Sequence, residues 1–186
     1  MKALWSLFWQ ILRFDRGPEE APNSPMLLLG LIALDYLLSL LSQGLSKGQA
    51  HWDYVIIIPL IALTVELASL QLLTAYKSVR YRYTQTATVI IGCDIILTLI
   101  SLPLSLAAMS MPDRSPLLPA FGILQMVLLG WGLGFRAFVY HRTINIGLIQ
   151  ANMLALALYL LALTFMVQAF PELLAQAQAA AAASQR

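Results

Sequence analysis

The chain has 186 residues, of which 60% are hydrophobic and 11% are charged, and its formal net charge is +2. A soluble domain has about a quarter of its residues charged, so this chain has too little polar surface to cover a soluble core. The same numbers exclude a disordered chain, a disulfide scaffold (Cys93 is the single cysteine) and a nucleic-acid-binding protein. The sequence therefore predicts an all-α integral membrane protein.

The first 14 residues predict an amphipathic helix. Lys2, Ser6, Gln10 and Arg13 recur at helical spacing and form one narrow polar stripe, and the rest of the segment is mostly apolar. This pattern is typical of a helix that lies in the membrane interface with its apolar side down. A signal peptide is the alternative, but two polar residues interrupt the apolar run and no small-residue cleavage site follows. Residues 15–24, in a proline-rich stretch, predict a loop.

Five segments are long and apolar enough to cross a bilayer, which takes about 20 apolar residues. They form a predicted five-helix transmembrane bundle within residues 25–170, with spans at 25–45, 54–76, 87–109, 116–140 and 147–170. Ser24 and Ser115 are candidate N-caps for the first and fourth spans. Pro103 is expected to kink the third span or to end it early. The Ala/Gln-rich tail, residues 171–186, either extends the last helix or frays.

The distribution of basic residues predicts the orientation, because cytoplasmic loops carry an excess of Lys and Arg. With five spans, the side of the N-terminus holds eight of the eleven: Lys2, Arg13, Arg16, Lys77, Arg80, Arg82, Arg136 and Arg142. The other side holds Lys47, Arg114 and Arg186. We expect a bacterial cytoplasmic membrane, with the N-terminus cytoplasmic and the C-terminus periplasmic. Aromatic residues at span ends predict a membrane-interface belt: Trp52, Tyr54, Tyr76, Tyr81, Tyr83 and Tyr140.

Charged residues inside the spans are the main candidates for function. Asp35 and Glu66 fall near the middle of the first and second spans, Asp94 lies in the cytoplasmic half of the third, and Arg136 near the cytoplasmic end of the fourth. Each such charge costs on the order of 3 kcal/mol at the bilayer centre, so we expect Asp94 and Arg136 to pair. The other two acids lack an obvious basic partner. They are expected to be protonated or to hydrogen-bond to Thr64, Gln71, Gln125 or Asn152.

These intramembrane residues support two interpretations. The favoured one is an internal polar network that fixes helix packing, and the alternative is a proton or cation path. Gly130 and Gly134 form a GxxxG pattern, for which packing within the chain is favoured over a seam between two copies. Basic residues beside the spans favour binding of anionic lipid headgroups, with docking of a cytoplasmic partner as the alternative: Lys77, Arg80, Arg82 and Arg142.

Catalytic and cofactor motifs are not found in the sequence. His51 and His141 fall on opposite sides of the predicted membrane, so they are not expected to share a metal ion. No nucleophile motif, P-loop or dinucleotide fingerprint is present, and the prediction is a protein that is not an enzyme and that has no cofactor. A weak internal repeat relates residues 35–42 to residues 94–101.

The order of several short motifs resembles the bacterial Yip1-domain (Yip1-like) inner-membrane proteins. A proline-rich lead, residues 17–25, precedes the first span, and a basic, tyrosine-rich lead, residues 81–85, precedes the third. The third span carries Leu-Pro-Leu at 102–104, and the fourth carries Trp-Gly-Leu-Gly at 131–134 before a basic loop. The resemblance implies a five-helix polytopic protein without established catalysis.

Two functions follow as hypotheses. The favoured one is a non-enzymatic scaffold or accessory subunit for lipid or for another membrane protein, with a second copy of the chain as a further partner. The alternative is a small transporter or channel component that uses Asp35, Glu66 and Asp94 for proton or cation passage. A transport site predicts that these acids converge on a water-accessible cavity, whereas a scaffold predicts a dry, satisfied network and an exposed apolar groove.

Overall fold

The computed structural model describes residues 2–46, 52–112 and 115–172, and this part of the chain is helical without a β-strand. The helices are α1 (Lys2–Leu12), α2 (Pro25–Ser46), α3 (Trp52–Tyr76), α4 (Tyr83–Met109), α5 (Leu118–Ile144) and α6 (Leu148–Ala169), with 3-10 turns at Pro18–Glu20 and Arg80–Arg82. Helices α2 to α6 are each long and apolar enough to span a membrane. The predicted all-α fold with five helices long and apolar enough to cross a membrane is thus confirmed in the described residues.

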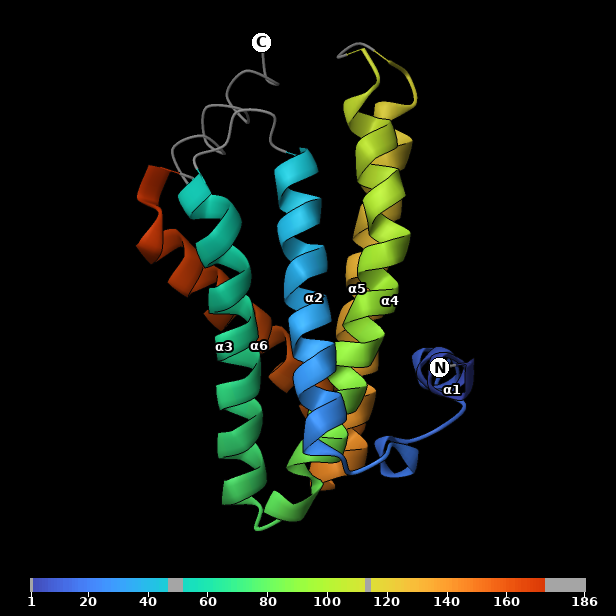
Figure 1. Ribbon diagram of the computed structural model, residues 1–186, viewed down its shortest axis with the longest axis vertical. Helices are drawn as coiled ribbons and strands as arrows, with labels where there is room; N and C mark the ends of the chain where they lie inside the picture. The colour runs from blue at the N-terminus through green and yellow to red at the C-terminus, as the bar shows by residue number, and fades with distance from the viewer. Residues whose placement is uncertain (1, 47–51, 113–114, 173–186) are drawn as a thin grey trace.

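The five spans form a closed ring of neighbours. Helix α2 packs on α4, α4 on α5, α5 on α6, α6 on α3, and α3 on α2. Figure 1 shows that α2, α4 and α6 start at the lower end of the bundle, where α3 and α5 finish. We call this end the basic end, because Arg80, Arg82 and Arg142 lie there. Since α2 and α4 run in the same direction side by side, residues at equal distances from their starts lie at similar heights.

Helix α4 runs through Pro103 without a break. It extends from Tyr83 to Met109, so the expectation that the proline ends this helix early is wrong. A proline removes a single backbone N–H from the helical ladder, and a membrane helix with packed neighbours tolerates that loss. Helix α4 also begins four residues earlier than residue 87, the predicted start of the third span.

The two predicted serine caps have different outcomes. The backbone N–H of Leu27 donates to Oγ of Ser24 at 3.3 Å, which confirms Ser24 as the cap of α2. Helix α5 begins at Leu118, three residues beyond Ser115, so the second cap is wrong. Ser115 instead lies in the turn before the helix, where its backbone carbonyl accepts from the Leu118 N–H at 3.2 Å.

Helix α1 packs its apolar face on α4. Leu7, Phe8, Ile11 and Leu12 are buried, while Trp5 remains half exposed. The prediction that this apolar face turns toward lipid is therefore wrong for the four buried side chains. A protein surface competes with lipid for the same face because both remove apolar area from water.

The C-terminal tail from residue 173, together with Lys47, His51 and Arg114, lies outside the described residues.

Candidate functional site

The four intramembrane charged residues lie at one level of the bundle. Each lies about ten residues from the basic-end terminus of its helix, which at 1.5 Å per residue is roughly 15 Å, about half of a bilayer core. The antiparallel order of the helices produces this common level from four separate sequence positions. The four are Asp35 on α2, Glu66 on α3, Asp94 on α4 and Arg136 on α5.

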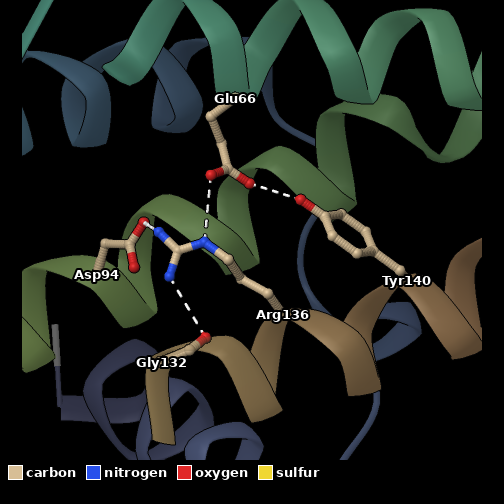
Figure 2. A network of polar contacts seen from close by, with 5 residues as sticks. All are labelled: Glu66, Asp94, Gly132, Arg136 and Tyr140. Carbon is tan, nitrogen blue, oxygen red and sulfur yellow. Dashed lines mark hydrogen bonds and ion pairs between the residues drawn. The ribbon is translucent and has the colours of Figure 1, made fainter. Parts of the chain in front are cut away.

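The Arg136 guanidinium joins two of the acids. Its Nη2 donates to Oδ2 of Asp94 at 2.6 Å, and its Nε donates to Oε2 of Glu66 at 3.2 Å. Its Nη1 donates to the carbonyl oxygen of Gly132 at 3.3 Å, so all three nitrogens have acceptors (Figure 2). The expected pairing of Asp94 with Arg136 is confirmed. The expectation that Glu66 lacks a basic partner is wrong, because a planar guanidinium with five N–H groups serves two carboxylates at once.

Tyr140 is the member of this cluster that sequence reasoning missed. Its hydroxyl donates to Oε1 of Glu66 at 2.7 Å, and its side chain is only 1% exposed. Its expected place in an interfacial aromatic belt is therefore wrong. Helix α5 continues four residues further, to Ile144, which carries Tyr140 and Arg136 deeper than predicted. The available signal was the spacing of four residues from Arg136, which puts both side chains on one helix face.

A cavity of about 440 Å³ lies between the spans, and all five spanning helices contribute to its wall. Asp35, Glu66, Asp94, Arg136 and Tyr140 all line it. The three acids singled out in the sequence thus line one cavity, which is one of the two features that the transport hypothesis predicts.

Asp35 differs from the other two acids. Its side chain is partly buried, lines the cavity, and forms no hydrogen bond or ion pair within the described residues. It is close enough to Glu66 and Arg136 to experience their charges. The polar partners proposed from the sequence do not reach any of the acids. Thr64, Gln71 and Asn152 are exposed, and Gln125 donates instead to the carbonyl of Ser101 at 3.5 Å.

The cavity has an excess of acidic groups. Three carboxylates and one guanidinium carry a formal charge of −2 when all are ionised. Removing such a charge from water costs several kcal/mol per ion unless it is compensated. Arg136 compensates Asp94 and Glu66 in part, and Asp35 has no partner of its own. The cavity lining therefore has a formal negative charge that a proton or a cation would offset.

The glycine pattern in α5 packs differently from the prediction. A Cβ at Gly130 would meet nothing within 4 Å, so the prediction that Gly130 packs against another part of the chain is wrong. A Cβ at Gly134 would lie 3.8 Å from the ring of Phe14. Gly132, between the two, is buried and faces the charged cluster, since a Cβ there would lie 3.6 Å from Nη1 of Arg136. The rotation of α5 that points Arg136 into the cavity also points Gly132 inward.

The basic residues predicted to contact lipid or a partner gather at one end of the bundle. Nη1 of Arg82 donates to the carbonyl of Arg142 at 3.3 Å, which joins the 3-10 turn before α4 to the last turn of α5. Nη1 of Arg142 lies 3.4 Å from Oε1 of Glu19, and both side chains are about half exposed. Lys77 and Arg80 are exposed at the same end.

His141 does not form a catalytic arrangement. Its Nδ1 lies beside the carbonyl oxygen of Ile146 and not beside an acid. In the described part of the chain, no three His, Cys, Asp or Glu side chains are grouped closely enough to hold a metal ion.

Comparisons of the chain with models of protein families, with curated proteins and with solved structures find no match in any of the three. The resemblance to Yip1-like proteins therefore stays a prediction from the order of sequence motifs. The function has to be argued from the cavity and its residues.

Proposed function

We propose that the chain is a small transporter or channel component that takes up protons or a cation in its intramembrane cavity. The observation that carries this proposal is the convergence of Asp35, Glu66 and Asp94 on one cavity of about 440 Å³. Ionisable residues inside membrane spans are costly, and they commonly mark ion or substrate pathways. An ion pair that serves only to stabilise helix packing needs one acid beside Arg136, whereas three acids line this cavity.

The proposed setting is a bacterial cytoplasmic membrane with the basic end facing the cytoplasm. The exposed Lys77 and Arg80 then lie beside anionic lipid headgroups, the partners proposed for this end. Helix α1 is proposed as an interfacial helix, because it is seen nearly end-on in Figure 1 while the spans stand upright.

Ion flux in proteoliposomes tests the proposal. Purified protein is reconstituted with a pH-sensitive dye inside, and proton entry is driven by a potassium-diffusion potential, with Na⁺ and K⁺ assayed in parallel. Asp35→Asn is the variant of choice, because among the described residues Asp35 forms no hydrogen bond or ion pair whose loss would unfold the bundle. We expect flux by the wild-type protein and its loss in the variant.

Asp53→Asn is the matched control, since it removes an exposed aspartate at the start of α3, outside the cavity. It should retain wild-type flux. Wild-type liposomes that conduct no better than empty ones, or an Asp35→Asn variant with unchanged flux, would overturn the proposal.

A non-enzymatic scaffold or accessory subunit is the second candidate. It is favoured by the Arg136 contacts, because two carboxylates and a carbonyl satisfy the guanidinium as a packing network requires. This function predicts no flux and a stoichiometric membrane-protein partner after purification in mild detergent. Mass spectrometry of the purified complex separates the two candidates.

A further inference from the structure

The cavity wall has a charged level and, further from the basic end, a mainly apolar region. The charged groups gather on the wall at the level of Asp35 and Arg136. Leu128 and Leu129 lie two turns nearer the start of α5, and Leu163 and Met166 lie near the end of α6. These four line the part away from the basic end, where Gln125 is hydrogen-bonded to the Ser101 carbonyl. A ligand that fits both parts carries a polar group at one end and an apolar body at the other.

The charges select the sign of that polar group. The one basic side chain among the cavity-lining residues, Arg136, already contacts Asp94 and Glu66, so an incoming anion would find no free cation there. Asp35 forms no ion pair in the described part of the chain and lines the same cavity. A positively charged group is therefore the complement of this wall.

The geometry of the acids also separates an organic cation from a metal ion. Among the described residues, no three acid, His or Cys side chains approach closely enough to hold a metal ion. A divalent metal such as Ca²⁺ needs about six to eight oxygen ligands at 2.3–2.6 Å. A cavity of about 440 Å³ falls within the usual range of about 300–1,000 Å³ for small organic ligands, and is much larger than a proton path requires.

We propose that this cavity binds an amphipathic organic cation, with its ammonium group at Asp35 and its apolar body along α5 and α6. The inference rests on the proposed function and names the substrate class for it. Tyr159 of α6 also lines the cavity, and an aromatic ring attracts a cation placed over its face. The apolar wall supplies most of the buried area, and the Asp35 carboxylate supplies selectivity for positive charge.

Binding of benzyltrimethylammonium to the full chain in lipid nanodiscs tests the inference. This probe keeps its charge at every pH, and neopentylbenzene is its neutral isostere with carbon in place of nitrogen. We expect saturable binding of the cation, with the neutral isostere at least about tenfold weaker, since it forms no ion pair in a desolvated site. Asp35→Asn should weaken binding of the cation by a similar factor, while Asp35→Glu should retain most of it.

The controls distinguish a variant that does not fold from a variant that folds but does not bind the probe. Each variant is checked by its unfolding temperature, and Asp53→Asn should bind like the wild-type protein. Absence of saturable binding to the wild-type protein overturns the inference, as does equal binding of the neutral isostere or unchanged binding in Asp35→Asn. If Asp35-dependent proton flux persists without binding of the probe, the organic-cation inference fails while the proposed function stands.

Discussion

Replacing Arg136 by glutamine removes the guanidinium that contacts both Glu66 and Asp94. The two ion pairs have lengths of 3.2 and 2.6 Å, and all three side chains are less than a quarter exposed. With an effective dielectric constant of about 20, Coulomb's law gives gross attractions of about 5 and 6 kcal/mol. Desolvation of the three ions offsets most of this attraction. We expect Arg136→Gln to lower the free energy of unfolding by about 3 kcal/mol, because it leaves uncompensated buried carboxylates.

A double-mutant cycle isolates the contact between Arg136 and Asp94. Asp94→Asn removes one carboxylate charge and keeps the side-chain volume, so the double variant should be more stable than the sum of the two single effects. We expect a coupling energy of about 1–2 kcal/mol, within the range for residues in contact. The parallel cycle with Glu66→Gln should give a smaller coupling, because that pair is 0.6 Å longer than the pair with Asp94.

The assay is thermal or denaturant unfolding in a fixed detergent, followed by the loss of helical circular dichroism. The exposed pair of Arg142 and Glu19 is the matched control, because it joins the same kinds of group at 3.4 Å with both side chains about half exposed. Its cycle should give less than about 1 kcal/mol. Strict additivity for Arg136 with Asp94, or a coupling no larger than that of the exposed pair, refutes the reasoning.

Two further predictions concern packing and orientation. Gly92→Ala should destabilise the protein by about 1–3 kcal/mol, because the new Cβ would lie 2.5 Å from the ring of Phe8, and Phe8→Leu should recover part of the loss in the same unfolding assay. In a Cys93→Ala background, a membrane-impermeant maleimide added to intact bacterial cells should label Ser110→Cys and spare Lys77→Cys. The reverse labelling pattern would contradict the proposed orientation.

Local sequence patterns were sufficient to predict the spans and one ion pair. Twenty apolar residues in a row have few stable alternatives to a membrane helix, so the five spans could be located to within a few residues. Asp94 and Arg136 lie on helices that follow each other in the chain, and neighbouring spans usually pack together. A charge in lipid needs a partner, and these two were the nearest candidates.

The remaining contacts depend on how the helices are rotated and how the ring closes. Glu66 reaches Arg136 because α3 packs against both α4 and α5, a non-local contact that no sequence spacing encodes. Gly132 faces inward and Gly130 outward because of the rotation of α5, which the GxxxG pattern does not fix. The packing of α1 on α4 depends equally on the long-range contact between Phe8 and Gly92.

The difference between two aspartates is the strongest argument that the cavity has a ligand. Asp35 and Asp94 lie about ten residues from the starts of parallel, adjacent helices, and their surrounding sequences are alike. Asp94 contacts Arg136, so its place in the membrane is explained by helix packing. Placing the charged Asp35 side chain in the bilayer has the same cost, on the order of 3 kcal/mol. Asp35 gains no ion pair among the described residues to offset it. In the function proposed above, a proton or a cation in the cavity supplies the missing compensation.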